Sequence, residues 1–437
     1  MGMAAARFGS SVMIEHVAWP RLLAPPAPVS GDGLRYSLSA ESGVAQALVA
    51  GDWAAARGFS DLAAIPPVQL YGPVHAAIGA ADLSLVNLEM PIVRDRPIIK
   101  DGPNFGGDPT LAEVLARAGW DAVSLANNHL RDQGDAAVAG TIAACRAAGL
   151  KTVGGGADRT AALEPLVIER RGLRIGLLAL AEPGDAVATA RHGGAADITD
   201  PMVPVAMADL RRRCDVVLVV AHGGVEYAPL PPPYWVDRLT ALVALGADGV
   251  IAHHPHVPQG MSLVERPGRA PAPIVWSLGN FIFPPRPPDQ QKPPHMDWGF
   301  VARLDLAVGQ VTTVELVPYR IHDGVGLSAI DRDGCERRAR FVATLGGLLT
   351  DRDAYEVWCD QFALRSWRVH ACERVRGLTA KLCAGEPEGL RHAQSHFLSP
   401  AHYALYGRAV QCQAEGVAED AAIQALIERW YQGTWPD

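Results

Sequence analysis

VVLVVAHGGVEY, at residues 216–227, combines an apolar run with the polar residues that follow it. Its first six residues are apolar, which is typical of a short strand buried in an α/β body. His222 follows this run directly, and Glu226 comes four residues later. Polar side chains at the carboxyl ends of such strands are expected to line a crevice. The stretch therefore predicts both a fold class and the edge at which a functional site would form.

The same arrangement recurs along the chain between about residues 44 and 320. Apolar runs predict strands at residues 47–51, 83–87, 122–126, 175–181, 216–221, 249–252 and 274–277. The spacing of apolar residues predicts helices between them, at residues 109–118, 135–148, 204–213 and 233–245. Residues 300–306 and 311–318 predict a closing hairpin. Interleaved strands and helices of this kind indicate the α/β class.

Three segments of the chain differ in composition and in the pattern of apolar residues. Residues 1–43 are rich in Pro, Ala and Gly and predict an N-terminal arm, with a loop before any regular element. Residues 44–320 are expected to form the catalytic domain. Residues 321–437 are expected to form a helical C-terminal domain, because long amphipathic stretches occur at 336–349, 354–364, 371–383 and 421–432.

Composition narrows the class of protein. A hydrophobic fraction of 49% and a charged fraction of 20% are those of a globular protein. The net charge of −8 argues against a nucleic-acid partner, and no apolar run approaches the roughly 20 residues of a spanning helix. Glu15 and His16 interrupt any signal-peptide core, and the seven cysteines lack CxxC spacing. We therefore expect a cytoplasmic protein with reduced thiols and no membrane partner.

Polar residues follow five of the predicted strands directly. They are Asp52; Asn87 and Glu89; Asn127, Asn128 and His129; His222 with Glu226; and His253, His254 and His256. Carboxylate oxygens, an amide oxygen and imidazole nitrogens at one sheet edge suit a divalent ion that prefers oxygen and nitrogen ligands. The alternative for the histidines is a satisfied core cluster. The alternative for Asp52 is a helix N-cap before Trp53, and Glu89 could be an ordinary loop carboxylate.

The order and spacing of these residues resemble the calcineurin-like metallophosphoesterase superfamily. The similarity is to its CapA-like branch, named for bacterial capsule and poly-γ-glutamate synthesis proteins, and covers about residues 46–320. It rests on these motifs: Gly51-Asp52, Val86-Asn87-Leu88-Glu89, residues 123–129, Asp132-Gln133-Gly134, residues 222–227, His253-His254-Pro255-His256 and residues 277–281. The resemblance implies a four-layer α/β/β/α sandwich.

The resemblance also implies roles for the matched residues. Asp52 and His256 would be ligands of a first metal. Asn128, His222 and His254 would be ligands of a second metal. Glu89 would bridge the two metals or bind one of them. His129 would lie beside the metals, as the histidine that meets the leaving group in phosphatase relatives. Supporting roles fall to Asn87, Asn127, Glu226, His253 and Asn280. The implied cofactor is one or two divalent ions, with Mn, Ca or Mg expected, and no organic cofactor.

Two departures from the family pattern matter. Ala54 stands where the superfamily commonly has a histidine, so the first metal would lose a nitrogen ligand. Capsule-type members are typically exported or tethered, and this chain shows no anchor. The long helical appendage makes it similar to CapA-like epimerases that convert the C-terminal residue of a lasso-peptide precursor to its D form.

A proline-rich loop follows the last motif. Residues 284–294 contain six prolines, and prolines stiffen a loop by fixing φ. His295 could be held above the metals by this loop, as one acid or base group, with Asp52 or His129 as the other catalytic group. The alternative for His295 is a solvated loop side chain.

Three functions follow from these expectations. The first is metal-dependent epimerisation of a precursor peptide, with a leader-peptide-binding protein as a further partner. The second is metal-dependent hydrolysis of a phosphoester or a γ-glutamyl amide, in which bound water becomes the nucleophile. The third keeps the fold for a non-catalytic peptide-binding or assembly factor.

Overall fold

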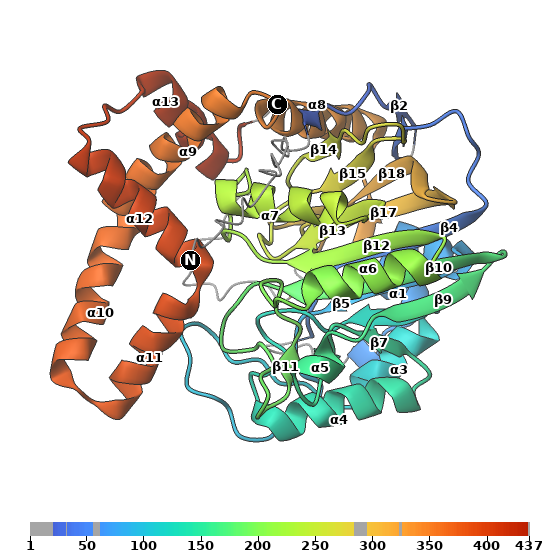
Figure 1. The fold of residues 1–437 in the computed structure, drawn as a ribbon, viewed down its shortest axis with the longest axis horizontal. Coiled ribbons are helices and arrows are strands. Elements are labelled where there is room, and N and C mark those ends of the chain that lie inside the picture. The colour runs from blue at the N-terminus through green and yellow to red at the C-terminus, as the bar shows by residue number, and fades with distance from the viewer. Residues whose placement is uncertain (1–20, 32, 56–61, 284–294, 323–325, 436–437) are drawn as a thin grey trace, which may run out of the picture.

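The computed structural model describes residues 21–31, 33–55, 62–283, 295–322 and 326–435. Two β-sheets pack face to face, with helices outside them (Figure 1). The first, a seven-stranded sheet, has the order β1 (Leu22–Leu23), β14 (Met261–Val264), β15 (Ala272–Val275), β13 (Gly249–His253), β12 (Val216–His222), β10 (Leu173–Ala181) and β9 (Leu166–Arg170).

The second sheet is ten-stranded and contains the N-terminal half of the site. Its path is β2 (Val29–Ser30), β3 (Leu34–Ser37), β18 (Gln310–Ile321), β17 (Trp298–Ala307), β4 (Ala45–Trp53), β5 (Leu83–Leu88), β6 (Ala122–Ser124) and β7 (Lys151–Val153). β16 (Asn280–Ile282) pairs with β4, and β19 (Leu327–Ala329) pairs with β18. A two-stranded sheet joins β8 (Gly155–Gly156) to β11 (Gly194–Ala195).

Parallel pairing brings the carboxyl ends of the central strands to one edge. β4, β5, β6 and β7 run parallel in one sheet, as do β10, β12, β13 and β15 in the other. Every residue of β5, β12 and β13 is buried. Burial on both faces of a strand requires cover on both sides of its sheet, which the second sheet and the helices provide. The predicted α/β class with a layered sandwich is confirmed.

The helices of the body follow the strands. They are α1 (Pro67–Tyr71), α2 (His75–Ala80), α3 (Thr110–Arg117), α4 (Gly134–Ala147), α5 (Arg159–Ala162), α6 (Val203–Arg213) and α7 (Pro233–Ala244), with 3-10 turns η1 (Leu62–Ala64) and η2 (Gly72–Val74). α6 and α7 contact the seven-stranded sheet, and α4 contacts β7. The four longer helices match the predicted ones to within about two residues.

A helical region follows the sheets, as predicted. It comprises α8 (Arg332–Leu348), α9 (Arg352–Ser366), the π-helical η3 (Trp367–Ala371), α10 (Cys372–Ala384), α11 (Pro387–Leu398), α12 (Pro400–Ala414) and α13 (Ala421–Tyr431). Helices α9 to α13 stand beside the sheets in Figure 1, in orange to red. The amphipathic stretches had predicted α8, α9, α10 and α13, but not α11 or α12. Among the described residues no helix is both long and apolar enough to cross a membrane.

The N-terminal segment differs from the prediction. The expectation that no regular element precedes residue 44 is wrong, because β1, β2 and β3 lie there as edge strands. β3 pairs with β18, and β1 pairs with β14. These strands are two to four residues long, so pairing with a distant partner defines them rather than any local apolar period. The boundary proposed at residues 43 and 44 stays a prediction.

Candidate metal centre

The ends of five strands place the polar residues that the sequence singled out. Asp52 is the penultimate residue of β4, Glu89 directly follows β5, and His222 is the last residue of β12. The others follow β6 and β13: Asn127, Asn128, His129, His254 and His256. The donors therefore come from both sheets and meet at their shared edge. Asp52 is the partner of Asn87 on one side and of Asn280 on the other, so it is not a helix N-cap.

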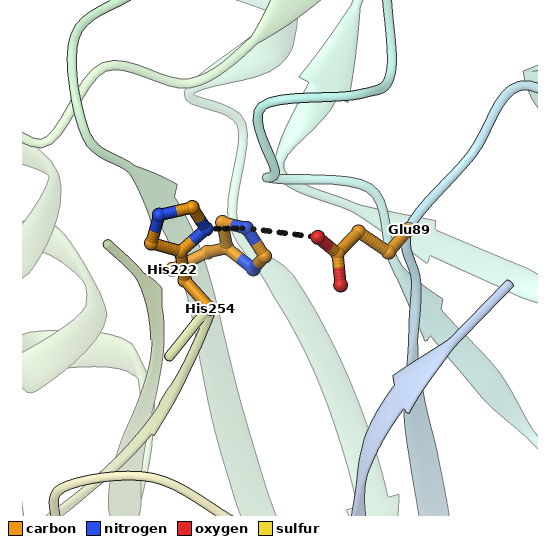
Figure 2. Close-up of side chains that lie close together, drawn as sticks. All are labelled: Glu89, His222 and His254. Carbon is orange, nitrogen blue, oxygen red and sulfur yellow. Dashed lines mark hydrogen bonds and ion pairs between the residues drawn. The ribbon is translucent and has the colours of Figure 1, made fainter. Parts of the chain in front are cut away.

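Glu89 lies at the centre of this group. Its Oε1 atom is 3.5 Å from Nε2 of His222 and 3.7 Å from Nε2 of His256. Figure 2 shows the carboxylate facing the rings of His222 and His254. The side chain is fully buried, and among the described residues neither carboxylate oxygen has a hydrogen-bond partner. Burial, followed by the charge of Asp52, raises the pKa of Glu89 well above its usual value.

A buried carboxylate without hydrogen bonds is costly unless a cation compensates it. Histidine nitrogens facing its oxygen are the other ligands that such a cation would need. The donor set therefore fits a divalent metal ion. Glu89, with no hydrogen bond to be broken, is the residue best placed to be shared between two ions.

One half of the group surrounds His222. Its Nε2 atom lies 3.0 Å from Oδ1 of Asn128 and 3.2 Å from Nδ1 of His254. Ligands about 2.1 Å from one ion are separated by about 3.0–3.4 Å, so these spacings suit a common metal. Burial and then the neighbouring His254 lower the pKa of His222 well below its ordinary value, and burial lowers that of His254 to about 4. Both rings are thus neutral, as metal ligands must be.

The other half surrounds Asp52, whose side chain is fully buried. Asn87 donates its Nδ2 hydrogen to Oδ1 at 2.8 Å, and the backbone amide of His254 donates to Oδ2 at 3.3 Å. Nδ1 of His256 is 3.5 Å from Oδ2. Burial would raise the pKa of Asp52, but the bond from His256 and the charges of nearby histidines outweigh it and lower the pKa. The carboxylate therefore stays ionised and available to a metal with Glu89 and His256.

Ala54 lies where the superfamily commonly has a histidine, and its side chain is fully buried. The Asp52 half therefore has one nitrogen donor among the residues described, His256, whereas the His222 half has two. The backbone is strained beside these donors, since φ is 101° at His254 and 58° at His256. Left-handed φ values at non-glycine residues cluster at functional sites.

His129 lies beside the group and contacts Asp132 and Lys100, which are both buried. The sequence motifs included His129 and Asp132 but not Lys100. Its Nδ1 atom is 2.6 Å from Oδ2 of Asp132 and 3.2 Å from Nζ of Lys100. Lys100 also forms an ion pair with Asp132. Burial lowers the pKa of His129; Asp132 opposes this shift and Lys100 adds to it. Asp132 belongs to one of the sequence motifs, whereas Lys100 lies in an irregular segment and belongs to none of them.

The residues expected in supporting roles do contact the donors. Asn127 donates from Nδ2 to Oδ1 of Asn87 at 3.3 Å and accepts the backbone amide of His129 at 3.1 Å. Other contacts are those of Asn280 Oδ1 with His256 Nδ1 at 3.0 Å and of His253 Nδ1 with Asp52 Oδ1 at 3.5 Å. Glu226 is exposed and lies with His254 and His256 in a third group of possible ligands.

His295 is not brought to the donors by any contact that the structure describes. Its ring packs at a tilt against that of Trp430, with centroids 4.3 Å apart, and the indole of Trp298 donates to its Nδ1 at 3.3 Å. The preceding loop, residues 284–294, lies outside the described part of the chain. Its acid or base role therefore stays a prediction, without support from these aromatic contacts.

A cavity of about 530 Å³ opens over the donors. Asn128, His222 and His254 line its inner end. Its other lining includes Lys100, Asp101 and Glu182 from the body and His370, Arg374, His402 and Tyr406 from the C-terminal helices. No sequence motif marks these helical residues, because they reach the cavity only through tertiary packing. Burial raises the pKa of Glu182 to about 7, and Tyr234 donates to it at 2.6 Å.

The chain was compared with known proteins. Residues 46–285, more than half of the chain, match the family model described as bacterial capsule synthesis protein PGA_cap. The chain is 26% identical over 280 residues to capsule biosynthesis protein CapA of Bacillus anthracis, covering 60% of this chain and 62% of that protein. It is 27% identical over 174 residues to PGA biosynthesis protein CapA of Bacillus subtilis (strain 168), covering 39% and 44%.

These matches span less than two thirds of the length of either relative. Among solved structures, 5'-nucleotidase from Candida albicans SC5314 aligns with a TM-score of 0.40 at 10% identity. That alignment covers 76% of this chain and 60% of the other.

Proposed function

The chain belongs to the PGA_cap family of bacterial capsule synthesis proteins, and we propose that it is a metal-dependent peptide epimerase. It would exchange the Cα proton of the C-terminal residue of a lasso-peptide precursor and convert that residue from L to D. The observation that carries the proposal is the buried group of donors around Glu89. Asn128, His222 and His254 of this group line a cavity, and the pair of His129 and Asp132 lies beside them.

The metal would be held by two sets of donors that share Glu89. One set is Asp52, Glu89 and His256; the other is Glu89, Asn128, His222 and His254. A divalent cation bound there supplies Lewis-acid polarisation of a substrate oxygen next to the Cα, which makes the Cα proton easier to remove. The identity of the metal, with Mn, Ca or Mg expected, is part of the proposal.

His129 is the residue best suited to take the proton. Its Nδ1 hydrogen is donated to Asp132, which leaves Nε2 as the acceptor. A buried imidazole that Asp132 orients and Lys100 keeps neutral can accept a proton near neutral pH. Phe105 stacks on the ring at 4.1 Å and holds its plane.

Epimerisation needs a second group on the opposite face of the Cα. Asp52, Glu226 and His295 are the candidates, and Glu226 is the one that is exposed in the cavity. Substitution of each residue in turn identifies the second group, because its loss should block proton exchange in one direction more than in the other.

Metal-dependent hydrolysis of a phosphoester or γ-glutamyl amide is the second candidate function. It is favoured by the place of His129 beside Asn128, where a histidine could protonate a leaving group. The relatives' names refer to capsule and PGA biosynthesis, so for this candidate function the substrate proposed is a γ-glutamyl polymer.

The experiment is incubation of the purified, metal-loaded protein in D2O with a candidate precursor peptide. A gain of one deuterium at the C-terminal Cα with an uncut backbone, together with D-residue on chiral analysis, supports epimerisation. Release of phosphate or amino acid supports hydrolysis, and no turnover of any kind supports a binding role. His254→Ala and Glu89→Ala should lose both metal and exchange, whereas Glu336→Ala, on an exposed face of α8, should keep both.

A further inference from the structure

Two cavities adjoin between the body and the C-terminal helices. The inner cavity is the one described above, over the metal donors. The outer cavity, of about 670 Å³, lies between residues 225–234 of the body and helices α9 and α12. Val225 and Leu405 line both cavities, so the two meet at this pair of side chains. Taken together, the two cavities define a candidate route from the metal donors to the surface beside α12, with these two side chains at its junction.

Helix α12 forms a wall common to the whole route. His402 and Tyr406 line the inner cavity, whereas Tyr403, Gly407 and Arg408 line the outer one. A helix of 15 residues is about 22 Å long. An extended chain advances about 3.3 Å per residue, so roughly six residues could lie along α12.

The outer cavity offers apolar and aromatic surface to side chains. Leu230 and Trp358 line it, and Phe362 stacks on Trp358 with a centroid separation of 5.3 Å. The ring of Tyr403 is 78% exposed at the edge of the cavity. Aromatic and apolar linings of this kind suit uncharged peptide side chains better than a uniformly charged polymer.

Charge in the outer cavity disfavours a polyanion. The outer cavity is lined by three acidic residues, Glu356, Asp360 and Glu415, and by one basic residue, Arg408. Arg408 is already bound to Glu356 and Asp360, each at 2.7 Å.

The inner cavity is likewise lined by more acidic than basic residues. The acidic residues that line it are Asp101, Glu182, Asp185 and Glu226, against the basic residues Lys100 and Arg374. Lys100 is paired with Asp132, and Arg374 with Asp101. The Lys and Arg side chains of both linings are thus already neutralised by carboxylates. Acidic residues outnumber basic ones in the outer cavity, where no metal donor lies, and they would repel a chain of carboxylates there.

We propose that α12 and residues 225–234 form a track for an extended peptide that is neutral or basic, and that poly-γ-glutamate is not its occupant. The C-terminal residue would enter the inner cavity, and about six preceding residues would lie along α12. This inference rests on the proposed function and names the substrate class for the same site. It assigns the selection of substrate to the helical region.

The test measures binding of dye-labelled ten-residue peptides by fluorescence anisotropy at low salt. Three peptides share their length and two tryptophans, and differ in carrying four serines, four lysines or four glutamates; deca-γ-glutamate is the fourth probe. The serine and lysine peptides should bind. The glutamate peptide and deca-γ-glutamate should bind at least tenfold more weakly, with a gap that narrows in 1 M salt.

Gly407→Trp tests the position of the track. A Cβ at Gly407 would meet no atom within 4 Å, so an indole can fill the outer cavity without displacing the backbone. Gly347→Trp is the matched control, because Gly347 lies within α8 and its Cβ is equally free of contacts. Gly407→Trp should weaken binding of the serine peptide at least tenfold, and Gly347→Trp should not.

The proposal is overturned if the serine and lysine peptides do not bind, if deca-γ-glutamate binds as tightly, or if Gly407→Trp binds like the unchanged protein. Glu89→Ala separates this inference from the proposed function. That variant should lose metal and proton exchange, yet it should still bind the serine peptide more tightly than deca-γ-glutamate. Absence of proton exchange in the unchanged protein, with peptide binding intact, counts against the enzyme proposal, whereas failure of the serine and lysine peptides to bind counts against the track.

Discussion

The Nδ1 atom of His129 lies 2.6 Å from Oδ2 of Asp132, and both side chains are buried. This contact fixes which ring nitrogen carries the proton and leaves Nε2 free to act as a base. Asp132→Asn keeps the size of the side chain but removes its charge. We expect kcat for deuterium exchange to fall about 100-fold or more, with KM nearly unchanged. Metal content, measured by elemental analysis, should match that of the unchanged protein; an unaltered kcat would exclude His129 as an oriented base.

Glu89→Gln removes the buried negative charge while preserving shape. Without metal, the carboxylate has no compensating hydrogen bond among the described residues, so the amide should raise the melting temperature of the metal-free protein. Metal affinity should fall at least 100-fold, because the amide is a weaker ligand. Calorimetry with and without added Mn²⁺ checks both effects. A metal-free Glu89→Gln protein that melts below the metal-free parent would contradict this account.

Asp101 connects the body to the C-terminal helices, and its pKa gives stability a defined dependence on pH. Burial would raise this pKa, but hydrogen bonds from His396 and Arg374 outweigh it and lower the pKa below its ordinary value. The stabilisation is therefore complete above the unfolded pKa of about 3.9 and is lost as pH falls through the folded value.

At pH 7, Asp101→Asn should reduce the free energy of unfolding by about 1–3 kcal/mol. The difference from the unchanged protein should persist to about pH 5 and shrink below about pH 4. Urea unfolding at several pH values measures this. Glu388→Gln, an exposed change on α11, should show no such difference. A difference that grew on acidification would refute the assignment.

Gly51 precedes Asp52 where β4 meets β16, and the close approach of two backbones requires a glycine. A Cβ there would lie 2.2 Å from the carbonyl oxygen of Gly279. Gly51→Ala should cost about 2–3 kcal/mol or more and lower metal content. Gly79→Ala, in helix α2 with no atom within 4 Å of the added Cβ, should instead stabilise by about 0.5–1 kcal/mol. Thermal melts of both variants make the comparison.

The sequence predicts an acid or base role for His295, whereas the contacts that the structure describes for it are aromatic. His295→Phe keeps an aromatic ring on Trp430, so we expect a melting temperature within about 3 °C of the original and most of the exchange activity. A loss of more than 100-fold in kcat at unchanged melting temperature would instead support the acid or base role that the proline-rich loop suggested.

The donors of the candidate metal centre could be predicted because local patterns position them. An apolar run defines each strand, and the next polar residue then lies at the carboxyl edge; Asp52, Glu89 and His222 all follow this rule. The structure places Oδ1 of Asn128 at hydrogen-bond distance from Nε2 of His222. Their action as ligands stays a proposal until metal is measured.

The walls of the cavity could not be predicted in the same way. Arg374 and His396 reach Asp101 across more than 270 residues of sequence, and no local period encodes such a pair. Helices α11 and α12 begin at Pro387 and Pro400, and their positions depend on packing against α10 and α9. The short edge strands β1 to β3 likewise exist because of their partners rather than their composition.

All the metal donors precede residue 257, whereas α12 and the other helical walls of the two cavities follow residue 350. The proposed metal chemistry and the proposed selection of peptides therefore belong to separate lengths of the polypeptide. Under these proposals, exchange of the carboxyl-terminal helices between relatives would change which peptides bind while the reaction stays the same. Relatives with this arrangement would then differ in their peptide substrates through changes in the C-terminal helices alone.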